Sequence, residues 1–336
     1  AQLAAEMGRW CGATALTFNM HCATMLWSSQ MADDLEMTDE QRTAHEGRRT
    51  GIYRKVIEDG AIFAQPFSEP NSAAAAGKAP FGTTARKGDG GWLVNGAKHF
   101  ASLAGAADFY GVLCTEAKDV GEADVRDTIY LAVDGTSEGF SIHGEWDVLG
   151  MRATSSNNLR LTDVFVPDAH QLMPRGKYYQ AALTWPHMFM TLCPTYMGIA
   201  QAAFDFTCQY LRGEIEGGPP AGSARHSAAK QLAVAEMRIK LEQARALFER
   251  AIGEAGMNPS KDERLRAYAA QYTVMEFAND ICRLALRTCG GRAIFRSLRL
   301  EQLYRDSRCG ALMLPWTPEI CMERLGRESL FEAGES

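Results

Sequence analysis

The chain has 336 residues, of which 46% are hydrophobic, and a formal net charge of -6. This length allows a large buried core and predicts two or three domains. Nucleic-acid-binding proteins usually present a basic face, and this acidic chain has no dense run of lysine or arginine, so we expect no nucleic-acid partner. No apolar run reaches the roughly 18 residues of a membrane span, so we expect no membrane insertion.

Nine cysteines are scattered along the chain without a C-x-x-C pair. An odd number at irregular spacing is not typical of a disulfide framework, and it predicts reduced thiols and a cytoplasmic location. The dispersed histidines and cysteines give no spacing typical of a metal site. The start, Ala1–Glu6, lacks the layout of a signal peptide. It looks like the middle of a helix, so we expect upstream helices to be missing.

Residues 1–60 have a helical pattern, in which Gln41–Asp59 form an amphipathic run that ends at Gly60. Residues 61–171 are different, because short β-branched and aromatic runs alternate there with glycine-containing turns. We expect a β domain of antiparallel type over 61–171, since no helix-length segment separates successive runs.

Residues 172–336 return to helical periodicity. Apolar residues at spacings of three and four predict two amphipathic helices, over 234–251 and 270–284, packed antiparallel across a loop at 256–261. A last helix is expected to begin at Thr317–Pro318, because threonine is a good N-cap and proline is tolerated at the first helical position. The three predicted domains are therefore 1–60, 61–171 and 172–336.

Familiar nucleotide-binding and hydrolase signatures are absent from the sequence. It contains no G-x-G-x-x-G, no G-x-x-x-x-G-K-[ST] and no G-x-S-x-G. A Rossmann domain and a serine-hydrolase elbow are therefore not expected.

Five sequence segments, in the order in which they occur, together resemble the flavin-contacting signatures of the acyl-CoA dehydrogenase superfamily. They are Phe67-Ser68-Glu69-Pro70, Asn95-Gly96-Ala97-Lys98-His99-Phe100-Ala101-Ser102, Leu149-Gly150-Met151-Arg152-Ala153-Thr154 with Asp163-Val164-Phe165-Val166-Pro167, Gly290-Gly291, and Leu303-Tyr304-Arg305-Asp306-Ser307-Arg308. The resemblance covers nearly the whole chain, except for the family's first helices.

This resemblance implies an α+β, mainly α, fold. A helical N-terminal part, a β-barrel-like middle domain and a C-terminal four-helix bundle are expected, in a homo-oligomer that is a dimer or a tetramer. It also implies FAD as the cofactor. The expected substrate is an acyl thioester on CoA or on an acyl carrier protein, with an electron-transferring flavoprotein or another acceptor as the redox partner.

The resemblance also assigns residues to the cofactor. Phe67 and Ser68 would contact the isoalloxazine, Phe100 would stack near the ring, and Ser102 would hydrogen-bond near N5. Gly290 and Gly291 would allow a neighbouring subunit's adenine to approach, because glycine has no side chain. Thr317 would begin a helix that faces the pyrophosphate, where free N–H groups favour an anion. Each of these residues also has a plain structural interpretation, as core, strand hydroxyl or helix cap.

The sequence departs from the family at the catalytic base. Removal of an α-proton requires a positioned base, and the family commonly places a glutamate just before the Gly-Thr that opens the last helix. This chain has Leu314-Pro315-Trp316-Thr317 there, and Met188 at the alternative family position. The arginine that some members use for CoA, near Phe189, is missing, and a glycine- and proline-rich insert at 213–222 replaces the R-x-x-F-G element.

Two residues are candidates for the missing base. Glu319 lies in the first turn of the last helix, where the helix dipole would lower the pKa of the carboxyl and weaken it as a base. His187 has apolar sequence neighbours, which favour a neutral imidazole that can accept a proton. His21 and His99 are weaker candidates, and all four have structural interpretations.

Three functions therefore remain open from the sequence. The favoured hypothesis is an FAD-dependent acyl-thioester dehydrogenase with a displaced base. The first alternative is a flavin-dependent monooxygenase on the same fold, which would not need the glutamate. The second is a non-catalytic relative that binds a thioester or a partner protein.

Overall fold

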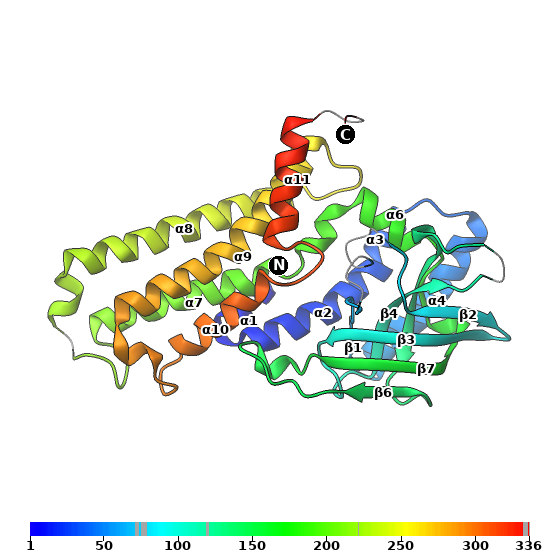
Figure 1. Cartoon of the computed structure of the whole chain (residues 1–336), viewed down its shortest axis with the longest axis horizontal. Helices are drawn as coiled ribbons and strands as arrows, with labels where there is room; N and C mark the ends of the chain where they lie inside the picture. Colours follow the sequence, from blue (N-terminus) through cyan, green and yellow to red (C-terminus); the bar gives the residue numbers. More distant parts are fainter. Residues whose placement is uncertain (71–73, 75–78, 119–120, 221, 332–334, 336) are drawn as a thin grey trace. The chain divides into compact units, whose positions relative to one another are not determined.

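The computed structural model describes residues 1–70, 74, 79–118, 121–220, 222–331 and 335, and the chain divides into two compact units (Figure 1). The helical unit comprises Ala1–Leu16, Val148–Ala153 and Phe189–Ser336. The sheet unit comprises Thr17–Asp147 and Thr154–Met188. The chain is thus α+β, as predicted, whereas the three-domain division of the sequence stays a prediction.

Within the described residues the sheet unit has one eight-stranded sheet with the order β6-β7-β3-β2-β4-β5-β8, and β1 pairs with β4. The strands are β1 (Phe63–Ala64), β2 (Thr84–Gly88), β3 (Gly91–Ala101), β4 (Phe109–Glu116), β5 (Thr128–Asp134), β6 (Phe140–His143), β7 (Asn157–Pro167) and β8 (Gln171–Met173).

The prediction of an antiparallel β domain is wrong for β4. This strand pairs in parallel with both β1 and β2, whereas the other pairs are antiparallel. The chain reverses once between β2 and β3 and again between β3 and β4, so β4 has the direction of β2. Because β7 pairs with the other edge of β3, β4 lies beside β2, and the sheet becomes mixed.

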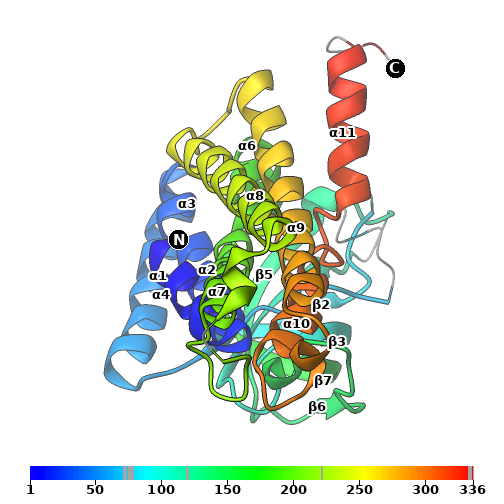
Figure 2. The same cartoon turned by 90° about the vertical axis from the view of Figure 1, so that its left-hand side faces the viewer.

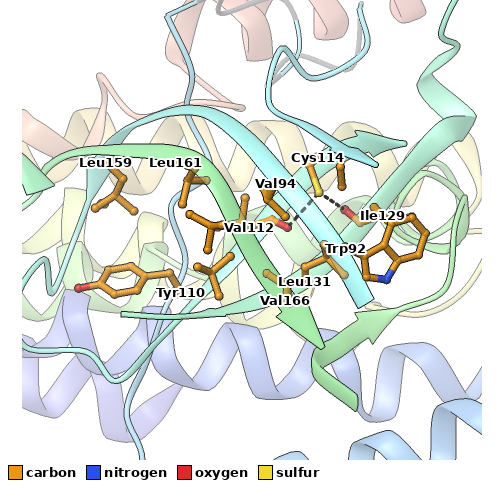
Figure 3. Packing of buried hydrophobic residues seen from close by; sticks show 14 of the residues in the cluster. Trp92, Val94, Tyr110, Val112, Cys114, Ile129, Leu131, Leu159, Leu161 and Val166 are labelled. Atoms are coloured by element: carbon orange, nitrogen blue, oxygen red, sulfur yellow. Dashed lines mark hydrogen bonds between the residues drawn. The ribbon is translucent and has the colours of Figure 1, made fainter. Parts of the chain in front are cut away.

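The core of the sheet unit follows from alternation along the strands. Trp92 and Val94 on β3 point inward, whereas Leu93 between them is partly exposed. They pack with a cluster of aliphatic and aromatic side chains from β4, β5 and β7 (Figure 3). Within it, the Cys114 thiol lies 3.8 Å from the carbonyl of Ile129. Each fully buried side chain of this kind contributes about 1.5–3 kcal/mol.

Among the described residues, four α-helices belong wholly or mainly to the sheet unit. They are α2 (Gly12–Ser28), which begins in the helical unit, α3 (Gln30–Asp33), α4 (Asp39–Glu58) and α6 (Lys177–Thr184). The helix α4 confirms the predicted helical run that ends near Gly60, but the prediction of an amphipathic helix is wrong, because α4 is strongly polar and has no distinct apolar face. It begins with a capping box in which Thr38 and Gln41 each satisfy the other's backbone N–H.

In the described part of the helical unit there are six α-helices: α1 (Gln2–Trp10), α7 (Cys193–Arg212), α8 (Ala228–Gly253), α9 (Lys261–Cys289), α10 (Leu300–Gly310) and α11 (Pro318–Leu330). Both predicted amphipathic helices are confirmed as α8 and α9, which run side by side and in opposite directions (Figures 1 and 2). The helices α7, α10 and α11 also pack on α9. None of the helices in the described part of the chain has both the length and the apolar character required to cross a bilayer.

Candidate functional site

The C-terminal end of β3 carries a β-bulge. Lys98 pairs with Leu159 of β7 and Ala101 pairs with Asn157, so β3 advances three residues where β7 advances two. The bulge contains Phe100, whose φ of 55° lies in the left-handed region. A residue with a Cβ atom adopts this region at a cost of about 1–2 kcal/mol, so neighbouring contacts must hold it there. Bulges often change the direction of a side chain next to a functional site.

The Phe100 side chain is 62% exposed even though it lies at the end of a well-buried strand. Its ring lies edge-on to Trp146, with the ring centroids 6.1 Å apart, and to His99 at 6.4 Å. A strained backbone that presents an aromatic ring outward fits a planar ligand such as the isoalloxazine expected from the sequence.

The segment that carries Phe67 and Ser68 meets β3 at this bulge. The His99 N–H donates to the Ser68 carbonyl at 2.8 Å, which makes an isolated antiparallel bridge. Phe67 is half-buried and lies 6.2 Å from the ring of Phe81 in an edge-on arrangement. Two motifs that are 25 or more residues apart in the sequence are thereby brought together within the sheet unit.

A buried ion pair lies directly beneath this contact. Lys98 Nζ is 2.7 Å from Glu69 Oε1, and both side chains are almost fully buried. The same ammonium donates to the Leu113 carbonyl at 2.5 Å, and Glu69 accepts the backbone N–H groups of Gly82 and Thr83. This pair was not among the residues predicted to be functional. Lys98 at an inward-facing position of β3 could have indicated it, because a buried lysine requires a buried partner.

Ser102 is 7% exposed and belongs to a chain of three hydroxyl groups. Its Oγ lies 2.8 Å from Ser156 Oγ, which lies 2.7 Å from Thr154 Oγ1. Three hydroxyls in series can donate in either direction, because each is both donor and acceptor. Ser102 was predicted from its motif, whereas Ser156 was missed, because their contact depends on the register of β3 and β7 at the bulge.

In the helical unit, two other signature segments meet. Asp306 accepts the N–H of Met151 at 2.5 Å, and Arg305 donates to the Leu149 carbonyl at 2.9 Å. A Cβ atom on Gly150 would lie 2.3 Å from the Arg305 carbonyl oxygen, so only glycine fits. Burial raises the pKa of Asp306, although its bond from Met151 opposes this. The aspartate is thus engaged in joining the two segments.

Gly290 and Gly291 follow the end of α9. Gly290 has a φ of 82°, which favours glycine, and both residues are exposed. Apart from the two chain neighbours of each glycine, no described residue has an atom within 4 Å of the Cβ position of Gly290 or Gly291. This open backbone is compatible with the close approach of another group, which the resemblance assigns to a neighbour's adenine.

Thr317 is the N-cap of α11, as predicted, and its side chain accepts the Ile320 N–H. Glu319 is exposed in the first turn. Hydrogen bonds from its own backbone N–H and from the Thr317 hydroxyl lower the pKa of the Glu319 carboxyl. This agrees with the direction expected from the helix position, and it makes Glu319 a weak base at neutral pH.

His187 is 5% exposed and lies in the 3-10 turn Pro186–Met190. It is the candidate base that is withdrawn from solvent, which suits an imidazole that accepts a proton from a buried substrate. Burial lowers the pKa of His21, whose Nδ1 accepts the Phe63 N–H at 3.0 Å. The structural interpretation of His21 is therefore the better one.

The predicted site residues divide between the two units. The sheet unit holds Phe67, Ser68, Phe100, Ser102 and His187, and the helical unit holds Gly290, Gly291, Thr317 and Glu319. Phe67, Ser68, Phe100 and Ser102 thus lie around the bulge of β3. Their roles toward a cofactor stay predictions. In the described part of the chain, no group of three His, Cys, Asp or Glu side chains could hold a metal ion.

Two family models match this chain. The acyl-CoA dehydrogenase middle domain matches residues 64–164, and the acyl-CoA dehydrogenase C-terminal domain matches residues 180–328. A putative acyl-CoA dehydrogenase, YdbM of Bacillus subtilis, is 29% identical over 284 residues, which are 82% of this chain and 70% of the relative.

Solved structures share the fold. KijD3 in complex with FMN and an amino-sugar nucleotide has a TM-score of 0.79 at 23% identity, with 97% of this chain and 78% of that chain covered. The dibenzothiophene monooxygenase TdsC of Paenibacillus sp. A11-2 has a TM-score of 0.75 at 18% identity, with 96% and 80% covered. The two consecutive family models together match most of the chain, and they show that it belongs to the acyl-CoA dehydrogenase family.

Proposed function

We propose that this chain is a flavin-dependent oxidoreductase that removes two hydrogens from the α and β carbons of an acyl thioester. The observation that carries this proposal is the bulge of β3, where the Phe67–Ser68 segment and the strained, exposed Phe100 converge. The family membership of the chain supports a flavin, and the family resemblance favours FAD. When bound, the flavin would supply the hydride acceptor.

The residues of the chain would bind and orient the reactants. Phe100 offers an aromatic face, and Ser102 offers a hydroxyl that is hydrogen-bonded to Ser156 and through it to Thr154. The α-proton of the thioester requires a base near its path. We assign this role to His187, because it is buried, whereas Glu319 is exposed and its pKa is lowered.

The thioester would be carried by CoA or by an acyl carrier protein. The absence of the CoA-contacting arginine near Phe189 makes a carrier protein a reasonable alternative. An electron-transferring flavoprotein would reoxidise the flavin, and the active form would be a homodimer or homotetramer. These partners rest on the family resemblance.

An absorbance experiment tests the reaction. Anaerobic mixing of the flavin-loaded protein with a panel of acyl-CoA and acyl-carrier thioesters should bleach the flavin band. His187→Gln should slow bleaching by about 10²–10⁴-fold, the usual contribution of a general base, without changing flavin affinity. The matched control is His143→Gln, an exposed histidine on β6. Equal rates for the His187 variant and the unmodified protein would rule out His187 as the base.

A flavin-dependent monooxygenase is the second candidate. The observation that favours it is the lack of a suitable carboxylate: residues 314–317 have none, and Glu319 is exposed with a lowered pKa. TdsC, which shares the fold, is named a monooxygenase. Oxygen consumption with supplied reduced flavin, together with a hydroxylated product and no thioester-driven bleaching, would select this function. A purified protein that takes up no FAD or FMN would instead select the non-catalytic alternative.

A further inference from the structure

We infer that the buried Glu69–Lys98 ion pair is a positioning pair, which fastens the 67–69 segment to β3 and thereby holds Phe100 in its left-handed conformation with the ring turned outward. The inference concerns the backbone of the sheet unit. Its consequence for cofactor binding rests on the proposed flavin function. The supporting contacts all lie within the sheet unit.

The first support is the order of contacts along β3. Lys98 is anchored to Glu69, and the next residue, His99, is bonded through its N–H to the Ser68 carbonyl. On the other side of Phe100, the Leu103 N–H donates to the Thr154 carbonyl at 2.9 Å. The backbone is therefore held on both sides of the bulge, where β3 has one more residue than the facing part of β7. Phe100 adopts the strained conformation that accommodates this extra residue.

The second support is that each N–H group of the Lys98 ammonium already has a partner within the sheet unit. The Lys98 ammonium faces Glu69, the Leu113 carbonyl and the Phe81 ring, whose centroid is 4.5 Å away. An ammonium has three N–H donors, so these three partners satisfy it. Lys98 is consequently no candidate for the proton acceptor of the reaction.

The third support is the set of hydrogen bonds to the Glu69 carboxylate. Besides the bond from Lys98, the carboxylate accepts the Gly82 N–H at 2.6 Å and the Thr83 N–H at 3.0 Å. Burial alone would raise the pKa of Glu69, but the adjacent Lys98 and these bonds hold it below its usual value. The carboxylate thus stays charged and keeps its position relative to β2 and β3.

Buried ion pairs contribute little net stability, and their best-supported use is to specify one arrangement among several. The decisive variant therefore removes both charges and keeps a similar side-chain volume. In Glu69→Gln/Lys98→Met, the amide oxygen can replace one carboxylate oxygen and accept from Gly82 or Thr83, and the apolar side chain leaves no unpaired ammonium. We expect this double variant to melt closer to the unmodified protein than Lys98→Met alone.

The first readout does not depend on any flavin. A crystal structure of the flavin-free double variant should show Phe100 out of the left-handed region and the His99–Ser68 bond lost. A Phe100 conformation identical to that of the unmodified protein would overturn the inference. The matched control is Lys87→Met/Asp168→Asn, which removes an exposed ion pair of the same unit with an N–O distance of 2.5 Å. It should leave Phe100 unchanged.

The second readout is flavin affinity, measured by titration of the flavin-free proteins with FAD and FMN. The dissociation constant of the double variant should rise by at least about tenfold, because misplaced supporting residues loosen a site, and the control pair should leave it unchanged. An unchanged affinity would contradict the functional consequence. An unmodified protein that binds neither flavin would instead overturn the proposed function, while the crystal structures still decide the inference.

If the double variant does not fold, Glu69→Asp provides the same test. It keeps the charge but withdraws the carboxylate by one methylene, so it cannot hold Lys98 and both backbone N–H groups at once. The expected result is again a displaced Phe100. A folded Glu69→Asp protein with the original Phe100 conformation would count against a positioning role.

Discussion

The end of β3 and the start of α11 both carry residues that the sequence marked as functional, yet they are built in opposite ways. At the end of β3, Phe100 occupies a conformation that its own chemistry disfavours, and contacts from distant segments hold it there. At the start of α11, Thr317 and Glu319 occupy positions that local helix rules favour.

The two sites differ in whether local structure alone explains the conformations of their residues. The contacts of Thr317 with the Ile320 N–H and the lowered pKa of Glu319 are fully explained by helix capping. The bulge of β3 is not explained locally, because a strained residue persists only where the surrounding structure determines it. We therefore expect substitutions at β3 to change both stability and ligand binding, and substitutions at α11 to have only local effects.

The largest contrast is expected between two glycine substitutions. Gly96→Ala should lower the free energy of unfolding by about 3 kcal/mol, because the new Cβ would lie 2.6 Å from the Thr83 Cα and the φ of 152° disfavours it. Gly326→Ala in α11 should instead raise it by about 0.5–1 kcal/mol, since nothing described lies within 4 Å and alanine favours a helix. Urea unfolding measures both. If both substitutions changed the free energy of unfolding by a similar amount, the proposed difference between β3 and α11 would be wrong.

The next effect separates strain from ring contact at Phe100. Both Phe100→Ala and Phe100→Gly remove the ring, but alanine keeps the left-handed strain. The glycine variant should therefore be more stable by about 1 kcal/mol, while both should bind flavin at least about tenfold more weakly because the aromatic face is lost. Thermal unfolding and flavin titration give the two numbers. An alanine variant as stable as the glycine variant would show that the backbone relaxes without cost.

A smaller effect is expected at Thr317. Thr317→Ala should lower the free energy of unfolding by about 1 kcal/mol, which is typical for the loss of an N-cap, and Thr317→Ser should restore it. Affinity for FAD should change by less than about threefold, because backbone N–H groups rather than the hydroxyl would bind a pyrophosphate. Comparison of FAD with FMN, which lacks that group, checks this point. If Thr317→Ala strongly weakened the affinity for FAD but not for FMN, the Thr317 hydroxyl would have a direct role in binding the pyrophosphate.

The smallest effect is expected at Glu319. Its folded pKa is lowered, so any contribution of the carboxylate to stability is present above the unfolded pKa and is lost as the pH falls through the folded value. At neutral pH it stays ionised, and Glu319→Gln should leave the rate of flavin bleaching within about twofold across pH 6–9. Stopped-flow measurements test this. A large loss of rate would make Glu319 the base in place of His187.

Local sequence patterns were sufficient for most of the helical elements. The apolar spacing in α8 and α9 and the Thr317–Pro318 start of α11 were confirmed, since side-chain periodicity and capping act over three or four residues. The direction of β4 was predicted wrongly, because strand pairing joins residues far apart and leaves little local signal. The Glu69–Lys98 pair was missed for the same reason.

Residue patterns were sufficient to identify the family, the alternation of helical and strand-rich regions, and the lack of a carboxylate at residues 314–317. The contact of Ser68 with His99, the bond of Ser102 to Ser156, and the strain and exposure of Phe100 became evident only in the folded chain. Motifs record which residues are present. Strain, burial and pKa instead depend on which distant groups the folded backbone brings into contact.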